Sequence, residues 1–290
     1  MIKKLYLLPG FFVVLAVVFT FVYAQNFFEI EGVGKPTWIL PTAIYANNDS
    51  RQALNEAYVI EEAGSLEESA DPFWWLDSGA MVYWLGNHFF TIQGDLSPDS
   101  RWWREYASSN PFDTDGGYHP QNLFRLITKK EWQNQQQEVY FKIKNYWISD
   151  TPSRNESNGI LLISRYLDDD NLYYAGLRVD GDVVVKKKQF GTYSVLAGKK
   201  ILPGKYDRLN NPNILPLNKW LGLKLVTVNK ENGDVSLELY LDLAGEGDWQ
   251  KVLEAIDERE NKPLTNKAHA GLRTDFMDVE MKDYKIFEIE

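Results

Sequence analysis

The chain has 290 residues, of which 44% are hydrophobic and 14% aromatic, so it can bury a sizeable core and is not expected to be disordered. Its formal net charge of -10 disfavours binding to the phosphate backbone of nucleic acids. It contains no cysteine, which excludes disulfides, thiolate nucleophiles and cysteine-ligated zinc.

The sequence begins with a short basic region followed by a long apolar run. Lys3 and Lys4 precede the run, which extends to about Val22, and "VYA" ends at Ala24 as at a signal-peptide cleavage site. With about twenty residues, the run is also long enough to remain as an uncleaved membrane anchor. Under either alternative, we expect residues 1–24 to direct export to the extracellular space or the cell envelope. The lack of cysteine in an exported protein fits a bacterial envelope.

The next segment, residues 25–72, has weak periodicity and is interpreted as a linker or N-terminal extension. Pro36, Pro41 and the stretch "NNDSRQ" interrupt it, and a short helix is expected over 53–63. Dense aromatic residues begin with "FWWLDSGAMVYWLGNHFF", so we expect one folded domain over 73–290.

The domain is predicted to be all-β, because short β-rich runs alternate with turn residues and no helix longer than about two turns is indicated. The pairs Asp180-Gly181 and Asn232-Gly233 are typical of two-residue β-hairpin turns. Strands are expected at 80–85, 89–93, 122–128, 138–148, 159–166, 172–179, 182–188, 193–200, 220–229, 235–241, 249–256, 268–274 and 279–288.

Period-2 alternation assigns one apolar and one polar face to these strands. The chain contains "AGLRVD" and later "AGLRTD". In each copy the alanine and leucine point to the core, while the glycine and Arg178 or Arg273 point outward. The flanking residues differ, so we interpret the two copies as a shared strand pattern and not as an internal duplication. The two arginines can form a site only if their strands are neighbours.

Several phrases resemble the concanavalin A-like jelly-roll sandwich, in particular the LamG-like and 3-keto-disaccharide-hydrolase-type domains of exported bacterial proteins. They are "NLFRLITKKEW", "EVYFKI", "SNGILLISRY", "NLYYAGLRVDG" and "AGLRTDFMDVEMKDYKI", and the resemblance covers residues 73–290. It implies two stacked sheets, with a polysaccharide bound or cleaved on the concave face. It also implies one structural calcium ion.

The outward polar residues are therefore candidates for binding a glycan. Arginine, lysine and tyrosine side chains can hold sugars, and an outward aromatic residue such as Trp103, Trp147 or Tyr146 can stack on a sugar ring. The alternative is that these side chains form ordinary cross-strand pairs with acidic neighbours. The binding candidates are Arg125, Tyr140, Lys142, Tyr174, Arg178 and Arg273.

Catalysis, as a polysaccharide lyase or a keto-sugar glycoside hydrolase, is the second hypothesis, and a structural envelope domain without a ligand is the third. Glycoside hydrolysis needs two carboxylates, but the Glu-x-Asp-x-(x)-Glu strand motif is missing; "DFMDVEM" lacks the leading glutamate. A polysaccharide lyase would need a cation with a tyrosine or histidine acid and base. Tyr174 and His269 are the catalytic candidates, and they require Arg178 and Arg273 in the same cleft.

The acidic loop "DTDGG" is the candidate metal site. Asp113 and Asp115 begin it as in a calcium loop, but the twelfth position is Phe124 and not glutamate. Acidic residues that favour tight turns are the alternative interpretation.

Overall fold

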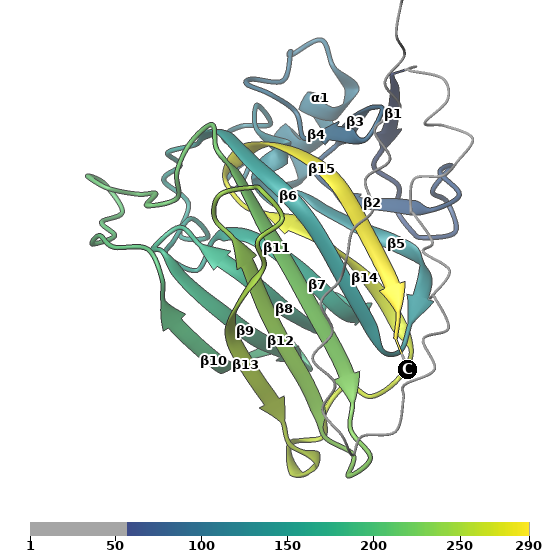
Figure 1. Ribbon diagram of the computed structural model, residues 1–290. Coiled ribbons are helices and arrows are strands. Elements are labelled where there is room, and N and C mark those ends of the chain that lie inside the picture. Colours follow the sequence, from purple (N-terminus) through teal and green to yellow (C-terminus); the bar gives the residue numbers. More distant parts are fainter. Residues whose placement is uncertain (1–56, 290) are drawn as a thin grey trace, which may run out of the picture. The chain divides into compact units, whose positions relative to one another are not determined.

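The computed structural model describes residues 57–289, which form two antiparallel β-sheets stacked face to face (Figure 1). Sheet A has eight strands in the order β1-β3-β4-β15-β6-β11-β12-β13, and sheet B has seven in the order β10-β9-β8-β7-β14-β5-β2. The elements are β1 (Tyr58–Glu61), β2 (Trp74–Ser78), β3 (Met81–Leu85), β4 (His88–Phe90), α1 (Arg101–Ser109), η1 (Pro120–Leu123), β5 (Arg125–Trp132), β6 (Gln135–Tyr146), β7 (Gly159–Asp168), β8 (Asn171–Arg178), β9 (Asp182–Gln189), β10 (Thr192–Lys200), β11 (Trp220–Asn229), β12 (Val235–Asp242), β13 (Gln250–Asp257), η2 (Arg259–Asn261), β14 (Ala268–Thr274) and β15 (Met277–Glu288). The all-β, two-sheet prediction is confirmed.

The expected signal or anchor segment, residues 1–24, lies outside the described residues, as does most of the expected linker. Within residues 57–289, no helix is long and apolar enough to cross a membrane.

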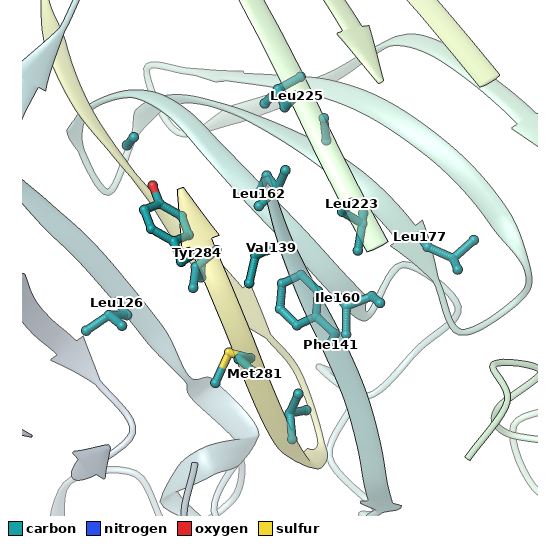
Figure 2. Packing of buried hydrophobic residues seen from close by; sticks show 14 of the residues in the cluster. Leu126, Val139, Phe141, Ile160, Leu162, Leu177, Leu223, Leu225, Met281 and Tyr284 are labelled. Carbon is teal, nitrogen blue, oxygen red and sulfur yellow. The ribbon is translucent and has the colours of Figure 1, made fainter. Parts of the chain in front are cut away.

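The core lies between the two sheets, where the inward side chains predicted from period 2 are buried. Figure 2 shows Val139 and Phe141 of β6 beside Met281 of β15, with Leu126 and Ile160 of sheet B in the same cluster. All five are fully buried. Burying one side chain of this size stabilises the fold by roughly 1.5–3 kcal/mol, so this alternation fixes which face of each strand is left for a site.

The folded domain starts before residue 73, so the expected boundary is wrong. Strand β1 pairs with β3 at the edge of sheet A, and its Ile60 is 4% exposed. The indole Nε1 of Trp75 donates a hydrogen bond to the carbonyl of Ala63 at 2.8 Å. The expected helix over 53–63 is also wrong where the structure describes it, because residues 58–61 are extended and belong to the sheet.

Helix α1 was not expected from the sequence. The Ser100 side chain caps it by accepting a hydrogen bond from the backbone N–H of Trp102 at 3.2 Å. Trp102 and Tyr106, four residues apart, form its buried face. The Trp102–Trp103 pair therefore does not alternate as on a strand, whereas Trp74 and Trp75 do: Trp74 is 1% exposed in the core, and Trp75 lies on the outer face of sheet B.

The two "AGLR" copies lie on β8 and β14, which pair with the two sides of β7. The glycine of each copy allows the backbone of the neighbouring strand to approach closely. An ideal Cβ on Gly176 would lie 2.3 Å from the carbonyl oxygen of Ile160, and one on Gly271 would lie 2.4 Å from that of Leu126. The shared pattern thus reflects similar packing constraints in one sheet.

Candidate binding site on the outer face of sheet B

The face of sheet B that points away from the core carries a second apolar cluster. Ile127, Leu161, Ile163, Tyr166, Leu172 and Tyr174 are its buried members, and Trp75 packs against it. This cluster forms a rigid floor from strands β5, β7 and β8. Polar side chains surround that floor, so the face combines apolar area with hydrogen-bonding groups.

A cavity of about 430 Å³ opens on this face. Its volume lies within the range of roughly 300–1,000 Å³ that is common for ligand sites. In the register of the sheet, Gly176 lies between the lining residues Leu161 and Val184, and a Cβ on Gly176 would already crowd Leu161. The cavity is lined by Ser153, Asn155, Ser157, Asn158, Leu161, Tyr174, Val184, Lys186, Tyr193, Arg273 and Asp275.

Two tyrosines form the aromatic part of the cavity. The rings of Tyr174 and Tyr193 are nearly parallel, with an interplanar angle of 25° and centroids 6.2 Å apart. Tyr174 is 3% exposed and belongs to the floor, whereas Tyr193, on edge strand β10, is 51% exposed. Tyr193 therefore offers a ring surface to a ligand.

Arg273 is held in place by two partners inside the cavity. Its Nε donates to Oδ1 of Asp275 at 2.7 Å, and its Nη1 donates to the hydroxyl of Tyr174 at 3.1 Å. Burial alone would lower the pKa of Arg273, but Asp275 and Tyr174 outweigh it and raise the pKa well above its usual value. The guanidinium is thus permanently charged, and its Nη2 makes no hydrogen bond to any of residues 57–289.

Lys186, on β9, is the second cation of the cavity. Its ammonium group has no hydrogen-bond or carboxylate partner among the described residues. Burial, and next the nearby charges of Arg178 and Arg273, lower its pKa below the usual value. The cavity therefore holds a positive charge that the surrounding protein disfavours.

One wall of the cavity is the connection between β6 and β7, residues 147–158. Arg154 is 4% exposed at its base and donates from Nε to the carbonyl of Ser149 at 2.6 Å. At the tip, the side chain of Asn158 accepts a hydrogen bond from the backbone N–H of Asn155 at 2.7 Å. The second bond fixes the amide of Asn158, and the amide of Asn155 is fixed by accepting from the backbone N–H of Ser157 at 2.9 Å.

Asp113 and Asp115, the expected calcium ligands, anchor this wall. Oδ1 of Asp115 accepts from the hydroxyl of Ser149 at 2.6 Å, and Oδ1 of Asp113 accepts from the hydroxyl of Thr151 at 2.5 Å. Across residues 57–289, no group of three or more His, Cys, Asp or Glu side chains is arranged to hold a metal ion. Both aspartates instead accept hydrogen bonds from neighbouring hydroxyl groups in this structure.

His119 contacts Asp115 and helps to hold the same wall of the cavity in place. Its Nδ1 lies 2.8 Å from Oδ2 of Asp115, its Nε2 lies 2.9 Å from Oδ1 of Asp95, and its ring stacks on Trp147 with centroids 3.8 Å apart. Burial would lower the pKa of His119, but the two carboxylates outweigh it and raise the pKa above the usual value. Because the imidazole covers Trp147, this ring is not an open sugar platform.

A second, smaller cavity of about 230 Å³ adjoins the first, since Arg273 and Asp275 line both. Its other lining residues are Ser78, Leu123 and Arg125. Arg125 forms ion pairs with Asp77 and, at 2.7 Å, with Asp169. Burial raises the pKa of the Asp77 carboxyl despite the neighbouring guanidinium of Arg125. The guanidinium of Arg125 is thus held in place on this face, and its charge is balanced by these two carboxylates.

The remaining predicted site residues do not join this group. Arg178 lies on sheet B but is tied to Asp180 by a 2.6 Å ion pair and lines neither cavity. His269 also lies on β14 and lines neither cavity, and its buried Nδ1 has no hydrogen-bond partner among the described residues. The cleft that the catalytic hypothesis requires therefore contains only Tyr174 and Arg273 of the four residues it named.

Tyr140 and Lys142 lie on β6 of sheet A, on the opposite side of the sandwich from the cavity. Lys142 pairs with Glu280 and lies over the ring of Trp220, 4.3 Å from its centroid. Grouping them with the sheet B residues was wrong, because an outward position does not specify the sheet on which a strand lies.

The sequence reasoning missed Lys186 and Tyr193 as site residues. Lys186 belongs to the run "VVVKKK", in which period 2 puts Lys186 and Lys188 on one face. Pairing β9 with β8 would have placed both lysines beside the outward Tyr174. The missing information was the strand order.

No protein-family model matches the chain, and no curated protein matches its sequence. Among solved structures, it is similar to the carbohydrate-binding module CBM66 from Bacillus subtilis, with 18% identity and a TM-score of 0.39 over 57% of this chain and 82% of that one. It is also similar to the Ca2+/Man3GlcNAc-bound exoplasmic/lumenal domain of VIP36, with 12% identity and a TM-score of 0.43 over 76% of this chain and 87% of that one. A mutant of the GH43 protein BlXynB from Bacillus licheniformis is similar as well, with 12% identity and a TM-score of 0.40 over 71% of this chain and 34% of that one. Because all three TM-scores lie below 0.5, neither the ligand nor the activity of this chain follows from them.

Proposed function

We propose that the chain binds a polysaccharide on the outer face of sheet B. The observation that carries this proposal is the 430 Å³ cavity, in which a half-exposed tyrosine ring stands opposite fixed amides and cations. A sugar presents apolar C–H faces and a rim of hydroxyl groups. Tyr193 suits the faces, and Asn155, Asn158 and Arg273 suit the hydroxyls.

The two adjoining cavities favour a polymer over a single sugar. They share Arg273 and Asp275, so a ligand that fills the first reaches the second without leaving the face. Their lining residues come from β2, β5, β7, β8, β9, β10 and β14 and from the adjoining loops, so a linear glycan would run across the strands.

Binding has more support than catalysis. Tyr174 is 3% exposed and hydrogen-bonded to Arg273, and His269 lies outside the cavity. The arrangement therefore supplies one tyrosine and one cation, but no second acid or base from the candidates.

Three finer expectations accompany this proposal. We propose that the sandwich is a concanavalin A-like jelly roll and that residues 1–24 export the protein as a signal peptide or membrane anchor. We also propose one structural calcium ion, and at Asp113 and Asp115 it would replace the hydrogen bonds that these carboxylates accept from Ser149 and Thr151.

Polysaccharide binding can be tested by affinity electrophoresis against neutral and acidic polysaccharides, comparing wild type with Tyr193→Ala. Loss of an aromatic stacking partner costs about 1 kcal/mol, so we expect roughly fivefold weaker binding. Tyr83→Ala is the matched control, because Tyr83 is 38% exposed on sheet A, away from the cavity. Failure of the wild type to bind any polysaccharide would overturn the proposal, as would equal binding by wild type and Tyr193→Ala.

A further inference from the structure

The cavity on sheet B carries an unbalanced positive charge, although the chain as a whole has a net charge of -10. Lys186 and Arg273 are its cations and Asp275 is its single carboxylate. Asp275 is committed to Nε of Arg273 at 2.7 Å. Lys186 therefore has no ion-pair partner among the described residues, and the charges of Asp275 and Asp180 offset the effects of burial and of the two arginines only in part.

The neighbours of Lys186 show that local compensation is available on the same strand. Lys187 points into the core and pairs with Asp257 at 2.9 Å, and Lys188 pairs with Asp170 at 3.1 Å. Of these three consecutive lysines, only Lys186 faces the cavity, and only Lys186 has no carboxylate partner in the part of the chain that the structure describes.

The two cations together suit an anionic group. The three N–H donors of Lys186 and Nη2 of Arg273 are free of partners among residues 57–289, and both side chains line the same cavity. An ammonium and a planar guanidinium bind the oxygens of a carboxylate or a sulfate through charge-assisted hydrogen bonds. A bound anion would also relieve the repulsion of Lys186 by Arg273 and Arg178, which together with burial lowers the pKa of Lys186.

From this geometry we infer that the ligand is an acidic polysaccharide, with the anionic group of one sugar held between Lys186 and Arg273. The inference rests on the proposed glycan-binding function and specifies the class of its ligand. Tyr193 stacks on the ring of that sugar, and the adjoining cavity beside Arg125 receives the next residue of the chain.

The test compares polymers that differ only in charge. Polygalacturonate provides carboxylates and dextran sulfate provides sulfate esters, and carboxyl-reduced polygalacturonate and unmodified dextran are their neutral counterparts. Dissociation constants for the full-length protein are measured by isothermal titration calorimetry. A charge-assisted hydrogen bond contributes roughly 1.5–3 kcal/mol, so we expect at least about tenfold tighter binding to one acidic polymer than to its neutral counterpart. Whether the carboxylated or the sulfated polymer shows the gain identifies the anion.

Three variants assign the effect to Lys186. Lys186→Gln keeps the length of the side chain and removes its charge, so it should lose the roughly tenfold preference, whereas Lys186→Arg should keep it. Lys251→Gln changes the net charge by the same amount at an exposed position on sheet A, where Lys251 pairs with Glu238 and Glu254, and should bind as wild type does. Circular dichroism of each variant verifies that it is folded.

The two proposals fail in different ways. Equal binding to acidic polymers and their neutral counterparts, or an acidic preference that Lys186→Gln retains, would overturn the acidic ligand and leave glycan binding intact. No binding to any of these polymers would overturn both.

Discussion

The buried ion pair between Lys187 of β9 and Asp257 of β13 connects the two sheets and provides a sharp test of the fold. The ammonium of Lys187 lies 2.9 Å from Oδ2 of Asp257 and also donates to the carbonyls of Asn261 and Lys262 at 2.8 and 3.1 Å. The same carboxylate oxygen accepts from the hydroxyl of Tyr173 at 2.6 Å. The side chains of Lys187 and Asp257 are 4% and 0% exposed.

Replacing Asp257 with asparagine should destabilise the protein strongly, because it leaves the Lys187 charge buried without a counter-charge. Breaking a buried pair from one side costs roughly 3–5 kcal/mol. Asparagine still accepts from Tyr173, so the loss reports mainly on charge. The double variant Lys187→Met/Asp257→Asn removes both charges and should recover most of the loss, to within about 2 kcal/mol of wild type.

Urea denaturation followed by tryptophan fluorescence measures these free energies of unfolding. Glu254→Gln is the control: its pair with Lys251 has the same 2.9 Å distance, but the two side chains are 48% and 44% exposed. Such surface pairs contribute at most about 1 kcal/mol. A loss below about 1 kcal/mol for Asp257→Asn, or a double variant no more stable than that single variant, would refute the reasoning.

Two further predictions concern the anchor and the floor of the cavity. The pKa of His119 is raised above 6.5, so the stability that its ion pairs contribute should be complete below about pH 6.5 and be lost as the pH rises through the raised pKa. His119→Asn should therefore lower the melting temperature more at pH 6 than at pH 9. Equal losses at the two pH values would contradict these ion pairs. Gly176→Ala places a Cβ 2.3 Å from a backbone oxygen and should cost about 1–3 kcal/mol in urea denaturation. Gly198→Ala, whose nearest neighbour would be 3.6 Å away, should change little, and similar losses for both variants would refute the close-approach argument.

Much of the fold could be predicted from the sequence, because burial on one face imposes period 2 on each strand. The prediction of β14 as 268–274 matches its bounds. The two expected two-residue hairpin turns are wrong, because the connections run over residues 179–181 and 230–234, where Gly181 and Gly233 but neither Asp180 nor Asn232 have positive φ. Short elements were missed: β1 has four residues, too few for a periodic pattern. Helix α1 was missed because its tryptophan pair suggested extended chain, although the Ser100 cap was present.

The site could be predicted only in part. Tyr174 and Arg273 were found because each lies outward on its own strand. Their contact depends on β14, near the end of the chain, pairing with β7, and no local pattern specifies this. Lys186 and Tyr193 join them only because β9 and β10 extend the same sheet. The error with Tyr140 and Lys142 has the same origin, since period 2 separates inside from outside but does not distinguish the two outer faces.

The construction of the cavity separates recognition from stability. Its floor is made of paired strands, but one wall is the single connection of residues 147–158, held at its base by Asp113 and Asp115. Changes of sequence at Ser153, Asn155 and Ser157 would leave the strand ladder, the buried Arg154 and these anchors in place. Exchange of this short segment is therefore a route by which proteins with this sandwich can acquire new sugar preferences without rebuilding the core.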